Sequence, residues 1–287
     1  MSTSPETTLN DLLGHVRRTI AEEMYARVAP IPMLAHYTSL DALRSILRSK
    51  ELWFSRIRDT NDTSEAVEGA AIVAAALEEH GQNIFKQYAD FGALEQFEAR
   101  RTMLETDTFV LSLCEHGSDR QTDRLVMWQA YGFNGNGLCL VLRKDSLLGQ
   151  KAKGLFPVHW CPIEYEAPEE LGDRVRRRLN QVEQAFNAAP QPIATLPKRV
   201  LGAVVASSVA SLVFGHKNPA FEHEREVRFV RSRLLQTLAP PDGAGYRRIT
   251  TQGKIKDIFV LPLRYYPEFP IDAALPNLLD HVIVGPL

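Results

Sequence analysis

Short apolar runs typical of strands are spread along this chain of 287 residues, between stretches that have the spacing of helices. Residues 227–230 and 52–55 combine β-branched or aromatic residues with polar neighbours, a composition that favours the pleated state. Residues 64–80 are rich in alanine and follow polar residues suited to a helix start. Strands scattered among helices predict an α+β fold with a split, mostly antiparallel sheet and surrounding helices.

The same patterns place the expected elements. We expect helices near residues 6–28, 40–50, 64–80, 91–104 and 123–131, and two more within 168–214, separated by prolines. We expect strands near residues 33–38, 52–55, 107–114, 137–142, 156–165, 225–231, 247–251, 255–261 and 281–285.

Two glutamates, Glu224 and Glu226, stand at the start of the strand expected near 225–231. Side chains of a strand alternate between its faces, so both carboxylates are expected on one side. Like charges repel there, which makes the pair costly for stability but useful for stabilising a developing cation or orienting a nucleophile. The alternative is a solvated edge on which both acids pair with Arg225, Arg228 or Arg231. For the pair alone, this alternative carries more weight.

A second group of polar residues lies near the other end of the chain. His36 and Thr38 occupy alternate positions of the strand expected near 33–38, so they face the same way. Ser39 and Asp41 follow as candidate helix N-caps before an amphipathic stretch that stops near residues 49–50. A histidine at a strand end is usually structural, but His-x-Thr before a tight helix suits the binding of a ribose and an amide.

Composition limits the classes of function. The hydrophobic content of 45% supplies a real core, and the net charge of −2 gives no global field for nucleic acid. Cys114, Cys139 and Cys161 show no metal-ligand spacing, which predicts a reducing, cytoplasmic setting without a structural metal. The apolar segment 200–214 contains serines and is too short to cross a bilayer, so we expect a buried helix and no membrane partner.

One basic cluster stands out. It consists of Arg174, Arg176, Arg177, Arg178, Lys198 and Arg199. The simpler interpretation is a helix face exposed to solvent. The alternative, which assigns a function, is contact with nucleic acid or an acidic target.

Several motifs, taken in order, resemble a bacterial family of domains of unknown function, number 2971. The motifs that carry this resemblance are 36–40, 46–47, 52–55, 60–62 with Glu65, 109–114, 127–132, 137–140, Phe221, Glu224, Glu226, Arg228 and 282–286. That family is in turn similar to the ADP-ribosyltransferase superfamily, which uses a first-strand His or Arg, a second-strand Ser or Tyr, and a late Glu. The resemblance covers most of the chain after residue 33.

The resemblance implies an enzyme that cleaves NAD, as a substrate, and transfers ADP-ribose to a nucleic-acid or protein target, as a toxin or phage-defence effector. It implies Glu226 as the group facing the cationic sugar and Glu224 on the acceptor side. His36 would hold a ribose hydroxyl, Thr38 the dinucleotide, and Ser112 would brace Glu226. Middle motifs of the best-studied transferases differ from the sequence around Ser112.

Two further assignments accompany the resemblance. Tyr37 or Tyr131 would stack on the nicotinamide, although core packing is the simpler role for each. The implied domains are an N-terminal helical extension, residues 1–32, and an ADP-ribosyltransferase-like domain, residues 33–287, with a helical insertion around 166–214. The alternative function is a non-catalytic module on the same fold that binds a nucleotide or a partner.

Overall fold

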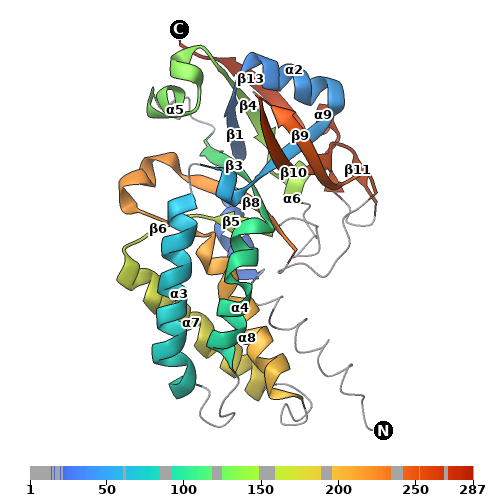
Figure 1. Ribbon diagram of the computed structural model, residues 1–287. Coiled ribbons are helices and arrows are strands. Elements are labelled where there is room, and N and C mark those ends of the chain that lie inside the picture. Colours follow the sequence, from blue (N-terminus) through green and yellow to red (C-terminus); the bar gives the residue numbers. More distant parts are fainter. Residues whose placement is uncertain are drawn as a thin grey trace.

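A computed structural model describes residues 14, 16, 20, 22–60, 63–84, 92–117, 125–148, 159–188, 196–233, 242–251, 253–267 and 271–286. It has an α+β architecture in which a mostly antiparallel sheet stands over a group of long helices (Figure 1). The predicted fold class is therefore confirmed at this level.

The strands lie close to where the sequence places them. The main sheet of the described residues contains β1 (Met33–Thr38), β2 (Glu51–Arg56), β3 (Thr108–His116), β4 (Leu138–Arg143), β5 (His159–Pro162), β8 (Glu226–Ser232), β9 (Gly245–Thr251), β10 (Lys254–Pro262) and β13 (Leu279–Val284). Short pairs are formed by β6 (Glu164–Tyr165) with β7 (His216–Lys217), and by β11 (Tyr265–Tyr266) with β12 (Ile271–Asp272). Every pairing in the main sheet is antiparallel.

Strand β3 is the branch point of the sheet. One edge of β3 pairs with β8 from Thr108 to Cys114. The opposite edge is shared, because β1 pairs at residues 114–116 and β2 pairs at residues 109–110. Between these two ladders, residues 111–113 have neither β1 nor β2 beside them. The sheet therefore opens here into two arms, with order β13-β4-β1 on one side and β2-β10-β9 on the other.

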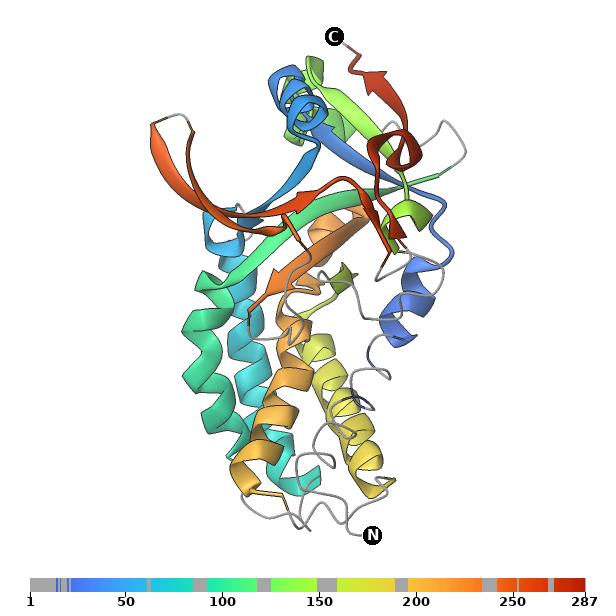
Figure 2. The same ribbon diagram turned by 90° about the vertical axis from the view of Figure 1, so that its right-hand side faces the viewer.

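The helices and 3₁₀ turns fall into two groups. The long ones are α3 (Thr63–Ile84), α4 (Ala93–Thr106), α7 (Pro168–Asn187) and α8 (Lys198–Val213), and the shorter ones are α2 (Leu40–Ser49), η1 (Ile57–Asp59), α5 (Leu125–Ala130), η4 (Phe133–Gly135), α6 (Asp145–Leu148), η6 (Pro219–Glu224) and α9 (Leu275–Leu278). Figure 2 shows the four long helices side by side below the sheet, while β9 and β10 curve away from it.

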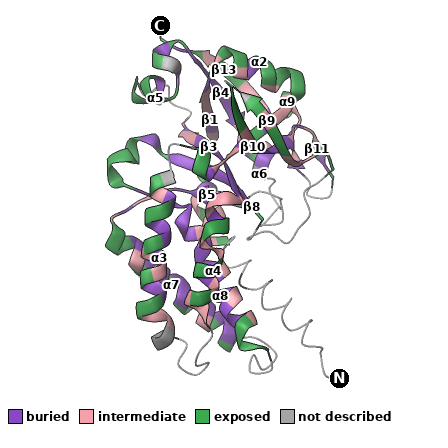
Figure 3. Ribbon diagram, viewed as in Figure 1, coloured by how far each residue is buried: buried purple, intermediate pink, exposed green. Residues whose placement is uncertain are grey.

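The long helices share one apolar core. On α7, Leu171, Val175 and Leu179 recur at helical spacing and are fully buried. They pack with Val205 and Val209 of α8, most of which is buried (Figure 3). The apolar segment 200–214 is thus a buried helix, as predicted. No helix of the described residues is long and apolar enough to cross a membrane.

Candidate functional site

A cavity of about 800 Å³ lies where β1 and β2 separate along β3. Its walls come from β1, α2, β2, β3, α5 and the segment before β8. All seven residues predicted for the site line it: His36, Tyr37, Thr38, Ser112, Tyr131, Glu224 and Glu226. Segments far apart in the chain therefore meet at one cavity, while the roles of these residues stay predictions.

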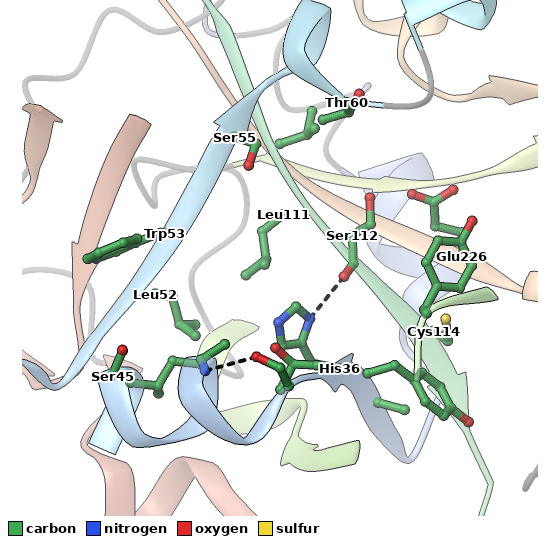
Figure 4. A pocket seen from close by; sticks show the side chains of 18 of the residues that line it. His36, Ser45, Leu52, Trp53, Ser55, Thr60, Leu111, Ser112, Cys114 and Glu226 are labelled. Carbon is green, nitrogen blue, oxygen red and sulfur yellow. Dashed lines mark hydrogen bonds between the residues drawn. The ribbon is translucent and has the colours of Figure 1, made fainter. Parts of the chain in front are cut away.

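His36 bridges the opening of the sheet. Its Nδ1 lies 3.4 Å from the backbone carbonyl of Ser112, in the part of β3 that β1 and β2 leave open (Figure 4). A carbonyl only accepts, so this contact favours the tautomer with the proton on Nδ1 and leaves Nε2 as an acceptor. Burial lowers the pKa of His36, although the Ser112 carbonyl opposes this effect, so the neutral ring predominates at neutral pH.

Helix α2 forms one wall of the cavity. Ser39 is its N-cap, and the Ser39 hydroxyl accepts a hydrogen bond of 3.1 Å from the backbone N–H of Ala42. Lys50 ends the helix in the left-handed conformation, with φ of 52°. Both ends agree with the sequence, and Ser39 rather than Asp41 takes the capping position. One face of the helix, including Ser45, borders the cavity.

The backbone around the two glutamates differs from the predicted strand. Glu224 is the last residue of the 3₁₀ turn η6, Arg225 has φ of 42°, and β8 begins only at Glu226. Period-two alternation therefore does not explain why the carboxylates meet. The left-handed residue turns the chain so that both side chains reach the same ammonium group.

The interpretation of a solvated edge is wrong for this pair. Glu224 and Glu226 are each 5% exposed, and β8 lies between β3 and β5. Glu226 does pair with Arg228, as that interpretation allowed, but the pair is buried.

Lys217, on β7, connects the two acids. Its Nζ lies 2.7 Å from Glu224 Oε2, 3.2 Å from Glu226 Oε2 and 3.7 Å from Glu65 Oε1. The side chain of Lys217 is 2% exposed, so these contacts are made away from water. An ammonium buried in this way is compensated by the surrounding carboxylates.

Arg228 completes the network from the middle of the sheet. Its Nε donates to Glu226 Oε1 at 2.8 Å, and its Nη2 lies 3.1 Å from both Glu226 Oε2 and Glu65 Oε2. Nη1 donates to the carbonyl of Phe214 at 3.2 Å. These contacts join three carboxylates to two cations, a group we call the ion network: Glu65, Lys217, Glu224, Glu226 and Arg228.

The ion network keeps Glu226 ionised. Burial alone would raise the pKa of Glu226, but the positive charges of Arg228 and Lys217, with hydrogen bonds from Arg228 and Ser112, lower it to about 2. A bond of this kind is the contact predicted for Ser112, whose bracing role stays a prediction. The backbone N–H of Glu226 donates to the Tyr165 hydroxyl at 2.6 Å, which fixes the start of β8.

The two tyrosines have different surroundings. Tyr37 packs edge-on against Trp128, with ring centroids 5.0 Å apart, so the core-packing role fits it. Tyr131 is 38% exposed, and its hydroxyl donates to Glu224 Oε1 at 2.8 Å. Core packing is therefore wrong for Tyr131, which orients a carboxylate instead.

Lys217 and Trp53 belong to this region but were not predicted from the sequence. Lys217 belongs to a two-residue strand that carries no periodic pattern, so its position depends on long-range packing. Trp53 lines the cavity from β2 and is 43% exposed. Exposure of a large aromatic residue on one face of a strand is a structural observation with no counterpart in the sequence.

The basic cluster does not form one face. Arg174 and Arg178 are buried, and they pair with Glu166 and Glu23 respectively. Arg176 and Arg177 are exposed, and Arg176 pairs with Asp173 at 2.9 Å. Helical spacing turns Arg174 and Arg178 towards the core and the other two towards solvent. The interpretation of a single solvated face is wrong for the two buried arginines, and contact with nucleic acid gains no support from them.

Metal ligands were not expected from the sequence. Within the described ranges, no group of three or more His, Cys, Asp or Glu residues is arranged to hold a metal ion. The three cysteines are free thiols.

Comparison with known proteins supports the predicted family. Residues 127–229 match the model of a family described as protein of unknown function, DUF2971. The matched segment runs from α5 into β8 and includes Tyr131, Lys217, Glu224, Glu226 and Arg228. The resemblance to this family is confirmed over these residues. No curated protein and no solved structure matches the chain.

Proposed function

We propose that the protein is an NAD-cleaving ADP-ribosyltransferase whose reaction takes place in the cavity beside β3. One observation carries the proposal: seven residues named for this chemistry, from four separate parts of the chain, line one cavity. Its volume of about 800 Å³ lies within the range of small-molecule sites.

The proposed reaction breaks the N-glycosidic bond between nicotinamide and its ribose. The bonding electrons leave with nicotinamide, and the sugar develops the positive charge of an oxocarbenium ion. The acceptor's lone pair then forms the new bond to the same carbon, and the acceptor's proton passes to Glu224.

The charge of the ion network suits this reaction. Its three carboxylates exceed its two cations, so the described group has one net negative charge, and Glu224 and Glu226 border the cavity in which the sugar would lie. Because the pKa of Glu226 is about 2, this residue is a fixed charge rather than a proton donor. Nε2 of His36, as an acceptor, would take a hydrogen bond from a ribose hydroxyl.

A second candidate function is a nucleotide- or partner-binding module without catalysis. It is favoured by the engagement of both carboxylate oxygens of Glu226 by Arg228 and Lys217. A carboxylate held by two cations stabilises a sugar cation less than one whose oxygens face the ligand alone. The acceptor, a nucleic acid or a protein, and a toxin or phage-defence role belong to the first proposal.

Release of nicotinamide from NAD separates the two candidates. The purified protein should release it, and Glu226→Gln should lower the rate on the order of 10²–10⁴-fold, because the charge opposite the cation is lost. Glu222→Gln is the matched control, since Glu222 is exposed on the same turn and lies outside the cavity. Equal rates for Glu226→Gln and the parent protein would rule out the proposed mechanism.

The fold of Glu226→Gln must be verified in the same experiment. Glu226 balances two buried cations, so we expect this substitution to lower the stability of the fold as well as the reaction rate. Thermal unfolding of each variant and NAD binding at a temperature well below the midpoint distinguish a lost charge from a lost fold.

A further inference from the structure

Trp53 presents an aromatic surface to the end of the cavity away from the ion network. Glu51, Trp53 and Ser55 occupy alternate positions of β2 and all three line the cavity, so they share the face turned towards it. Leu52 and Phe54 belong to the apolar core under the sheet, and Leu52 also borders the cavity. Figure 4 shows Trp53 and Glu226 on opposite sides of the cavity, with Leu111 and Ser112 between them.

A hydrogen bond from the indole nitrogen of Trp53 holds the ring in place. Its Nε1 donates to Glu51 Oε2 at 3.0 Å, and Glu51 Oε1 lies 2.8 Å from Arg247 Nη1 on β9. This chain of contacts restricts the ring while 43% of Trp53 stays exposed. A large apolar ring that is fixed in place and left open to a cavity loses little entropy when a flat ligand covers it.

We infer that Trp53 is the stacking platform for a purine base of a nucleotide ligand. Every nucleobase has a π-face, and stacking on an aromatic side chain is a common way of binding one. This inference deepens the proposed function and rests on it for the identity of the base. With the nicotinamide ribose at Glu226, the other ring of NAD is adenine, which would reach the opposite end of the cavity.

The neighbouring wall provides polar groups for the rim of the base. Ser45 and Ser49 of α2 border the cavity on the same side as Ile46, and both serines are exposed. The Ser45 hydroxyl donates to the carbonyl of Asp41 at 2.9 Å and can accept from a ligand, while the Ser49 hydroxyl can donate or accept, so the pair suits the mixed edge of a purine. The aromatic end and the ionic end would therefore bind different parts of one ligand.

Binding of nucleotide fragments tests this inference without any turnover. AMP and ADP-ribose contain the adenine ring, whereas nicotinamide mononucleotide does not. The protein should bind the two adenine ligands with quenching of tryptophan fluorescence. Of the three tryptophans, Trp128 is buried and Trp160 packs against Phe229, so Trp53 is expected to give most of the change.

Substitution of Trp53 provides the decisive comparison. In calorimetric titrations, Trp53→Ala should weaken AMP and ADP-ribose binding at least about fivefold, the lower limit expected for one lost base–aromatic stack. Trp53→Phe should restore part of the affinity, because it keeps a ring. Tyr265→Ala, which removes an exposed aromatic residue outside the cavity, should change nothing. Binding of nicotinamide mononucleotide should be the same in all variants.

Each result supports or overturns the purine site. Unchanged affinity of Trp53→Ala for ADP-ribose, or no binding of AMP and ADP-ribose to the parent protein, would overturn it. Nicotinamide release that is insensitive to Trp53 would leave the proposed function in place and remove this inference. Trp53-dependent binding of ADP-ribose without any nicotinamide release would keep the purine site and remove the enzymatic proposal.

Discussion

At the scale of single residues, Lys217 is the side chain whose importance the sequence conceals. Its ammonium lies between Glu65, Glu224 and Glu226, and its removal would take away a cation that all three carboxylates contact. Removing one partner of a buried ion pair lowers the free energy of unfolding by roughly 3–5 kcal/mol. Lys217→Met should lower the free energy of unfolding by an amount of this order in urea titrations.

Two variants control this prediction. Lys217→Arg keeps the charge and should recover part of the loss. Lys254→Met removes an exposed lysine of β10 and should leave the urea midpoint within experimental error. If Lys217→Met unfolds at the same urea concentration as the parent protein, the contacts of Lys217 in the ion network do not stabilise the fold, and the prediction is wrong.

Residue types were predictable at this scale, but contacts were not. Glu224, Glu226 and His36 were identified from residue type and position in the sequence, and Ser112 through the family resemblance. The φ of 42° at Arg225 was not anticipated, since alternation along a strand assumes an extended backbone. Lys217 escaped attention because nothing near it in the sequence indicates its three partners.

At the scale of elements, helix α2 forms a cavity wall whose start is set by the capping residue Ser39. The Ser39 hydroxyl caps the helix at the N–H of Ala42, so Ser39→Ala should cost about 1 kcal/mol in the free energy of unfolding. Ser45→Ala, in the middle of the same helix, should be neutral or slightly stabilising, since alanine favours helix interiors. Urea unfolding of both variants measures the difference, and equal effects would contradict the capping role.

Elements with strong periodicity were predictable, and short ones were not. The ends of α2 and the positions of β2, β3 and β10 follow from caps and alternation. The two-residue strands β7, β11 and β12 and the turn η6 escaped prediction, because so few residues form no pattern. Residues 6–13 of the expected N-terminal helix lie outside the described part of the chain, whereas residues 22–28 are helical.

At the scale of the whole molecule, the ion network links stability to pH. The pKa of Glu226 is about 2 in the folded protein, below the ordinary glutamate value of 4.5. A lowered pKa contributes stability that is present above about pH 4.5 and is lost as the pH falls towards 2. Glu226 should contribute on the order of 3 kcal/mol to this acid-dependent loss.

The measurement compares urea unfolding of the parent protein and Glu226→Gln at several pH values between 6 and 2.5. The parent should lose more stability than the variant over this range, because the variant cannot bind a proton at position 226. Parallel curves would show that the pKa of Glu226 is close to its ordinary value in the folded state.

The class of fold was predictable from the sequence, but the division of the sheet into two arms at β3 was not. Scattered strands and helices predicted the α+β architecture. The opening of the sheet depends on where β1 and β2 pair along one edge of β3, which is a long-range property. The cavity follows from that opening, so its existence was inferred only through the family resemblance.

The central claim is that the open edge of β3 binds NAD with its nicotinamide ribose beside Glu226. A crystal structure with an NAD analogue in which carbon replaces the ring oxygen of that ribose tests this most directly, because the analogue resists cleavage. We predict that the ribose lies within hydrogen-bond distance of Glu226 and His36, and that the adenine ring stacks on Trp53. An analogue bound elsewhere, or an empty cavity at saturating analogue, would contradict the claim.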